Sequence, residues 1–74
     1  MINKNLLKSA IAIQGLNFSK LAELFRKNKI NITLETLYRK VREGGQSLKL
    51  WEIKAIANTL NLTDEEIINI FFCD

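Results

Sequence analysis

Apolar residues recur at spacings of three and four through the middle of the chain, a pattern typical of amphipathic α-helices. Two such stripes follow each other: Leu21, Leu24 and Phe25, then Leu34, Leu37 and Val41. Asn17 can cap the first of these helices, and Leu16 and Leu21 on either side of it are spaced as a hydrophobic staple. Residues 17–41 therefore predict two helices joined by a turn, each with one apolar and one polar face.

Start and stop signals set the ends of the first two helices. The first is expected from residue 3 or 4 to residue 14, because Gly15 suits the left-handed position that follows a helix. The second is expected over residues 18–25, and we favour a further turn, to residue 27 or 28. The basic run that follows Phe25 would then lengthen the helix rather than form a separate loop.

Three further helices are predicted from the same signals. Asn31 or Thr33 can cap the third, which runs to about residue 42 or 43 and is stopped by the pair Gly44–Gly45. The fourth is expected over residues 47–60. The fifth opens with Thr63–Glu66, which has the form of a capping box. The predicted fold class is a compact all-α bundle of five helices.

The expected core consists of the inward stripes of these helices. In the first helix the stripe is Leu6, Leu7, Ala10, Ile11 and Ile13; in the fourth it is Leu50, Ile53, Ile56, Ala57 and Leu60. Ile30 and Ile32 should anchor the turn. Trp51 lies off the inward stripe, which leaves two interpretations open, a contact with a protein partner or packing against residues 24–29.

The end of the chain carries more apolar residues than one face of a short helix requires. They are Ile67, Ile68, Ile70, Phe71 and Phe72. Part of this set is expected to close the core and part to meet another chain. Together with Trp51, we assign Ile68, Phe71 and Phe72 to a protein interface.

Composition limits the classes of protein that fit. With 74 residues, 47% hydrophobic residues and no proline, the chain predicts one domain, residues 1–74. It has no histidine and a single cysteine, Cys73, so neither a disulfide within the chain nor a metal framework is expected. We interpret Cys73 as an incidental reduced thiol rather than an intermolecular bridge. No cofactor, catalytic activity or membrane span is expected, and the predicted location is cytoplasmic.

The net charge of +3 is unevenly placed: basic residues gather in the middle of the chain and acidic residues near its end. A basic middle is consistent with a nucleic-acid-binding face. A solvated lysine-rich surface would give the same pattern, so charge alone leaves both interpretations open.

Several short runs, taken in order, resemble small phage regulators of the Cro and lambda-repressor type. They are residues 15–23, the run Thr36–Val41, which is similar to the family's "TLYRKL", residues 50–57, residues 60–67 and residues 70–72. The chain departs from the family in a longer spacing between Ala22 and Leu37, which puts extra residues in 24–29. Asn31 stands in place of the family's turn glycine and would take its left-handed conformation. Leu34 and Glu35 stand where that family reads DNA.

The resemblance implies a lambda-repressor-like domain with a helix-turn-helix formed by the second and third helices. The third, residues 33–43, would lie in the major groove of an operator as a recognition helix, and the protein would bind as a homodimer, associated with the nucleoid of a bacterial host. The implied DNA contacts are Ser19, Lys27, Lys29, Thr33, Glu35, Thr36, Arg39, Lys40 and Arg42. The alternative is an antirepressor or modulator of repression that has this fold and binds a phage repressor protein.

Overall fold

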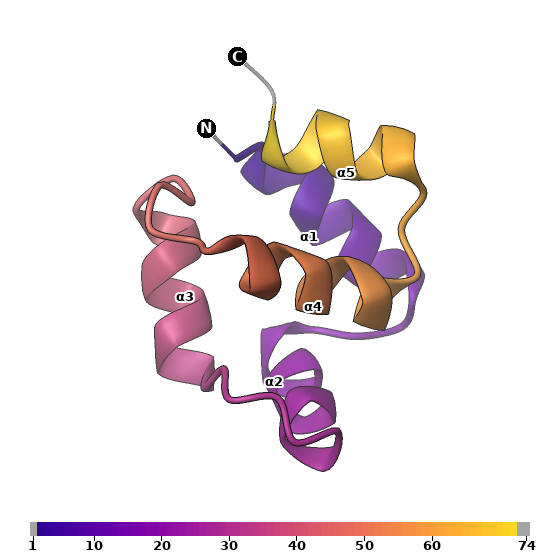
Figure 1. The fold of residues 1–74 in the computed structure, drawn as a ribbon. Coiled ribbons are helices and arrows are strands. Elements are labelled where there is room, and N and C mark those ends of the chain that lie inside the picture. The colour runs from indigo at the N-terminus through magenta and orange to yellow at the C-terminus, as the bar shows by residue number, and fades with distance from the viewer. Residues whose placement is uncertain (1, 73–74) are drawn as a thin grey trace.

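The computed structural model describes residues 2–72 and forms five α-helices (Figure 1). They are α1 (Lys4–Ile13), α2 (Phe18–Lys27), α3 (Leu34–Arg42), α4 (Leu50–Leu60) and α5 (Asp64–Phe71). The all-α class and the number of helices predicted from the sequence are confirmed. Cys73 lies outside the described residues. No described helix has the length and apolar character needed to cross a membrane.

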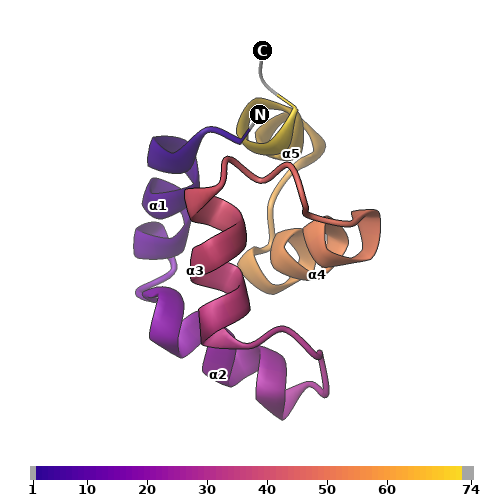
Figure 2. The ribbon, with the colours of Figure 1, turned by 90° about the vertical axis from the view of Figure 1, so that its left-hand side faces the viewer.

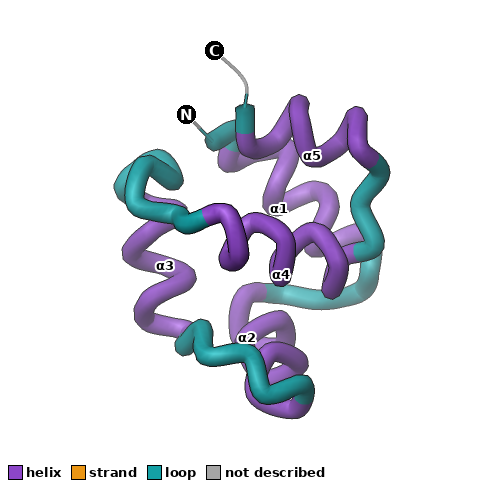
Figure 3. The backbone as a smooth tube through the Cα atoms, viewed as in Figure 1, coloured by secondary structure: helices purple, strands orange, loops and turns teal. Residues whose placement is uncertain are grey.

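The helices wrap around one core with α3 at the edge of the molecule. In Figure 1, α4 crosses the front, α1 lies behind it, α5 covers one end and α2 the other. When the molecule is turned by 90°, α3 faces the viewer along most of its length (Figure 2). Short connections join the helices, as the teal segments of Figure 3 show. The Cα radius of gyration is 11.0 Å.

Side-chain caps start α1, α2, α3 and α5 where the sequence predicts them. The Asn3 side chain accepts from the backbone N–H of Leu6, and that of Asn17 from Lys20 at 2.8 Å. Thr33, rather than Asn31, caps α3. Thr63 and Glu66 form the predicted reciprocal capping box. A cap of this kind contributes about 0.5–2 kcal/mol, so these residues fix where the helices begin.

Each of α1 to α4 is followed by a residue in the left-handed conformation. Two backbone N–H groups at or after that residue donate to carbonyl groups in the last turn of the helix. The left-handed residues are Gly15, Lys29, Gly44 and Asn61. After α2, for example, Ile30 N–H donates to the Phe25 carbonyl at 2.8 Å and Lys29 N–H to Arg26 at 3.1 Å, the two bonds of a Schellman motif. The prediction that Asn31 takes the left-handed position is therefore wrong. The extended α2 moves that position back to Lys29.

The structure shortens α4 at its start and exposes its first residue. The sequence predicts a helix from residue 47, but α4 begins at Leu50, after a loop in which Leu48 N–H donates to the Gly45 carbonyl. Leu50 is 63% exposed, whereas Leu48 packs against the core. The prediction of an inward Leu50 is wrong, because Leu48 supplies the apolar contact at this end of the helix. Leu6 and Ile13 are likewise exposed rather than in the core.

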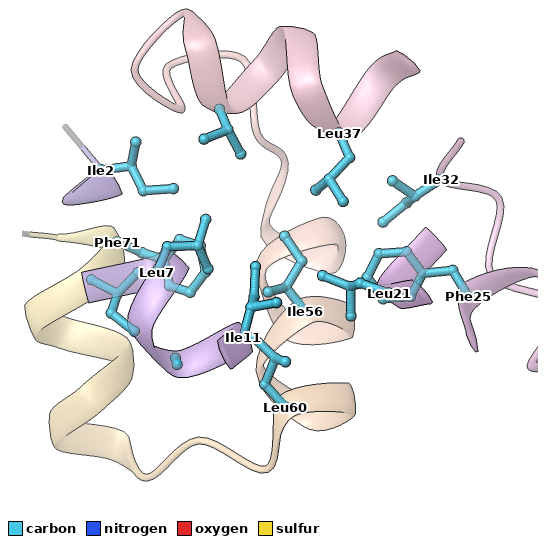
Figure 4. Packing of buried hydrophobic residues seen from close by; sticks show 13 residues of the cluster. Ile2, Leu7, Ile11, Leu21, Phe25, Ile32, Leu37, Ile56, Leu60 and Phe71 are labelled. Atoms are coloured by element: carbon cyan, nitrogen blue, oxygen red, sulfur yellow. The ribbon is translucent and has the colours of Figure 1, made fainter. Parts of the chain in front are cut away.

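The core runs through the molecule from the α1–α5 end to the α2–α3 end. Figure 4 shows Leu7 beside Phe71 at one end, Leu21, Phe25 and Ile32 at the other, and Ile11, Ile56 and Leu60 between them. Each fully buried side chain of this size contributes about 1.5–3 kcal/mol. Phe71 is 7% exposed, so its assignment to a protein interface is wrong; it closes the core between α5 and α1.

The first residues of the chain tie three helices together. The Ile2 N–H donates to the Gly44 carbonyl at 3.0 Å, and the Asn3 N–H donates to the Ile70 carbonyl at 2.7 Å. The Lys4 ammonium donates to the Arg42 carbonyl at the end of α3 at 3.0 Å. These bonds hold the C-terminal ends of α3 and α5 against the start of α1. They therefore fix the direction in which α3 points.

Candidate nucleic-acid interface

The outer side of α3 presents a continuous polar face. Leu37 and Val41 are buried, which turns the opposite side of the helix to solvent. The α3 face consists of Glu35, Thr36, Tyr38, Arg39 and Arg42, which line one shallow groove. Residues 35, 39 and 42 are spaced by four and three, so they follow one another along one side of the helix. Four of the predicted contact residues are thus brought together.

An aromatic pair joins this face to the start of α2. The rings of Tyr38 and Phe18 have centroids 5.0 Å apart and are tilted by 47°. Phe18 is half-buried, and its packing on Tyr38 gives it a structural role. Tilted aromatic pairs at this distance contribute about 0.5–1.5 kcal/mol beyond the area they bury. The pair thus contributes to fixing how the middle of α3 sits against α2.

A buried ion pair fixes the other flank of α3 to α4. The Lys40 ammonium lies 2.8 Å from both carboxylate oxygens of Glu52, which is only 3% exposed. The backbone N–H of Lys49 also donates to this carboxylate at 2.8 Å. Because a lysine side chain has no acceptor, only this half of a capping box forms at the start of α4. Lys40, predicted as a phosphate contact, is thus engaged by Glu52 inside the fold, and its side chain is only 12% exposed.

Two opposing effects act on the pKa of Glu52. Burial raises the pKa, because the charged form loses its hydration. The hydrogen bonds from Lys40 and from the Lys49 backbone, together with the two lysine charges, lower it more and hold the pKa below the ordinary value of 4.5. Glu52 is therefore ionised at neutral pH, which keeps Lys40 paired.

A second groove lies between α2 and the start of α3. The residues that line it include Ser19, Glu23, Arg26, Lys29 and Thr33. It brings together the predicted contacts at 19, 29 and 33. Lys27 is exposed but lines neither groove. Arg26 was not among the predicted contacts, although its helical spacing from Ser19 and Glu23 places it on the same side of α2.

Hydroxyl groups at the start of α3 already have local partners. The Thr33 hydroxyl accepts from the Thr36 N–H at 3.2 Å and donates to the Thr36 hydroxyl at 3.0 Å. Thr33 is therefore committed to capping the helix. The Thr36 hydroxyl oxygen accepts this bond.

The charges around the two grooves are mixed. Arg26, Lys27, Lys29, Arg39 and Arg42 are all exposed, and within residues 2–72 the Lys40–Glu52 contact is the only salt bridge. Glu23 and Glu35 lie among these cations. Across residues 2–72 no group of acidic or cysteine side chains is placed to hold a metal ion. The two grooves thus offer free cations and a few carboxylate and hydroxyl groups for polar contacts.

Comparisons of the chain with protein-family models, with curated protein sequences and with solved structures return no match.

Proposed function

We propose that this protein is a sequence-specific DNA-binding regulator of the Cro and lambda-repressor type, in which α2 and α3 form a helix-turn-helix. The observation that carries the proposal is the α3 face: one side of a single helix exposes Glu35, Arg39 and Arg42 while the other is fixed in the core. A helix of this kind fits the major groove, where side chains reach the edges of bases.

Each exposed residue of the α3 face has a chemical role in this proposal. Arg39 carries two parallel donors that suit the O6 and N7 acceptors of guanine. Glu35 can accept from the amino group of cytosine, and Thr36 can donate from its hydroxyl. Arg42, at the end of α3, would contact the phosphate backbone of DNA rather than the base edges. Specificity would thus rest on residues 35, 36 and 39.

Phosphate contacts in this proposal come from the end of α2 and the loop after it. Arg26, Lys27 and Lys29 are exposed cations there. Each cation that neutralises a phosphate releases a counterion, so binding weakens as salt rises. Lys40 is left out of this set, because Glu52 holds its ammonium group.

The proposal predicts that Arg39→Ala lowers affinity for the cognate operator by about 1–3 kcal/mol and relaxes specificity at one base pair. The measurement is a salt titration of binding to the DNA that flanks its coding region, against unrelated DNA of equal length. Arg39→Lys is the matched control, because it keeps the charge and removes the paired donors. It should lose specificity while keeping the salt dependence. Equal, weak binding of the unchanged protein to both DNAs would contradict DNA reading.

A second candidate function is a protein-binding modulator of repression. It is favoured by Leu50 and Trp51, which are 63% and 49% exposed at the start of α4. Tryptophan is enriched among the residues that anchor protein interfaces. In this case Trp51→Ala would abolish a complex with a phage repressor, as measured by co-elution, without changing the helical circular dichroism. Co-elution that survives the substitution removes the anchor from this candidate.

A further inference from the structure

A small apolar surface with a positive charge lies at the start of α4. It consists of Leu50, Trp51 and Lys54, all exposed, and we call it the α4 patch. Lys54 follows the two apolar residues at helical spacings of four and three, which places it next to them. Within residues 2–72 Lys54 has no salt bridge.

A second apolar surface, with a negative charge, lies along α5. It consists of Glu65, Ile68 and Phe72 at positions i, i+3 and i+7, and we call it the α5 patch. Ile68 is 57% exposed and Phe72 is 55% exposed. The helix cap uses the Glu66 carboxylate, which accepts from the Thr63 N–H at 2.9 Å. Glu65 is not engaged in this cap and has no salt bridge within residues 2–72.

The two patches are complementary in charge and do not cover each other within one copy, since their apolar side chains remain about half exposed. We propose that the α4 patch of one copy packs on the α5 patch of a second copy. Trp51, Ile68 and Phe72 supply the apolar contact, and the pairing of Lys54 with Glu65 fixes the orientation. This contact goes beyond the proposed function, because it forms without DNA.

Charge also argues against the two symmetrical pairings. If the α5 patches of two copies packed on each other, two Glu65 carboxylates would meet at one interface. If the α4 patches of two copies did so, two Lys54 ammonium groups would meet. Like charges across an interface weaken association. Pairing of unlike patches avoids both repulsions.

The test is sedimentation of the DNA-free protein over a range of concentrations. Trp51→Ala and Ile68→Ala should each weaken self-association by more than tenfold, since each removes an apolar anchor from one patch. An equimolar mixture of the two variants should regain a dimer, because each variant keeps the patch that the other has lost. Circular dichroism checks that both variants stay folded. Ile13→Ala is the matched control: Ile13 is 80% exposed but belongs to neither patch, so its loss should change nothing.

Charge reversal gives an independent measurement of the same contact. Lys54→Glu and Glu65→Lys should each weaken association, and the chain that carries both changes should recover it. Three results would overturn the proposal: a monomeric parent protein at every concentration, a mixture of variants that stays monomeric, or association lost through Ile68→Ala but kept in Trp51→Ala. The DNA titration is read separately, so failure of this contact leaves the proposed function to its own test.

Discussion

Lys29 occupies a backbone conformation that L-residues other than glycine adopt at a cost. Its φ of 60° lies in the left-handed region, where the Schellman motif after α2 requires it. The cost for a residue with a Cβ atom is roughly 1–2 kcal/mol. At the corresponding position after α1 the chain has Gly15. The side chain at residue 29 thus costs stability at a position that lines the groove between α2 and α3.

We expect Lys29→Gly to stabilise the fold and to weaken DNA binding. Relief of the strained φ exceeds the roughly 0.4–1 kcal/mol that the added freedom of glycine costs in the unfolded chain, so the melting temperature should rise. Loss of one phosphate contact should reduce the slope of log affinity against log salt by about 0.9. Lys27→Ala is the control, since it removes a neighbouring charge from inside α2 without a change at positive φ. A fall in the melting temperature of Lys29→Gly would show that position 29 carries no strain.

Among the elements, α3 depends on partners from three other parts of the chain. Tyr38 packs on Phe18 of α2, Lys40 pairs with Glu52 of α4, and the Arg42 carbonyl accepts from Lys4 of α1. These contacts hold the middle and the C-terminal end of α3. The proposed DNA binding would need α3 to be held rigidly so that its side chains meet base edges, and these contacts are consistent with that need.

The ion pair between α3 and α4 predicts a dependence of stability on pH. Because the folded pKa of Glu52 lies below its ordinary value of 4.5, the pair contributes fully above that pH. Its contribution is lost as pH falls through the lowered pKa, when the folded carboxylate takes up a proton. Urea unfolding at neutral pH and between about pH 3 and 5 should therefore show a loss of stability on acidification.

Glu52→Gln isolates this contribution. The substitution should cost about 1.5–3 kcal/mol of unfolding free energy at neutral pH, the range for hydrogen bonds to a charged group. It should also reduce the loss of stability on acidification. Glu43→Gln is the control, because it removes an exposed carboxylate that belongs to no salt bridge within residues 2–72. If Glu52→Gln lost as much stability on acidification as the parent protein does, the loss would belong to other groups.

The elements were more predictable from the sequence than the contacts between them. Caps and apolar spacing are local signals, so the helix starts at Asn3, Asn17 and Thr63 could be placed correctly. The ion pair of Lys40 depends on how α3 crosses α4, and the burial of Phe71 depends on where α5 meets α1. Neither crossing is encoded in a short window of sequence. The residues that line the two grooves were predicted for the same reason only in part: Arg26 was missed, and Lys40 lines neither groove because it pairs with Glu52.

On the scale of the whole molecule, the start of the chain joins the ends of α3 and α5. Ile2 is 8% exposed and packs in the core, while its N–H bonds to Gly44. Gly45, at φ 77°, lies so close to Ile2 that an added Cβ would stand 2.9 Å from the Ile2 Cβ. This close approach leaves no room for a side chain at residue 45, so the junction depends on glycine there.

Gly45→Ala should therefore destabilise the protein more than Gly15→Ala. Gly15 has a similar φ of 72°, but an added Cβ there meets nothing within 4 Å. Both substitutions carry the left-handed penalty of roughly 1–2 kcal/mol, and only the one at residue 45 adds the clash with Ile2. The difference in unfolding free energy between the two variants measures the clash alone. In an Ile2→Ala background the difference between the two glycine variants should shrink, because the side-chain atom 3.1 Å from the added Cβ is gone. Equal losses in the two glycine variants would mean that the junction yields without cost, and that the start of the chain does not fix the direction of α3.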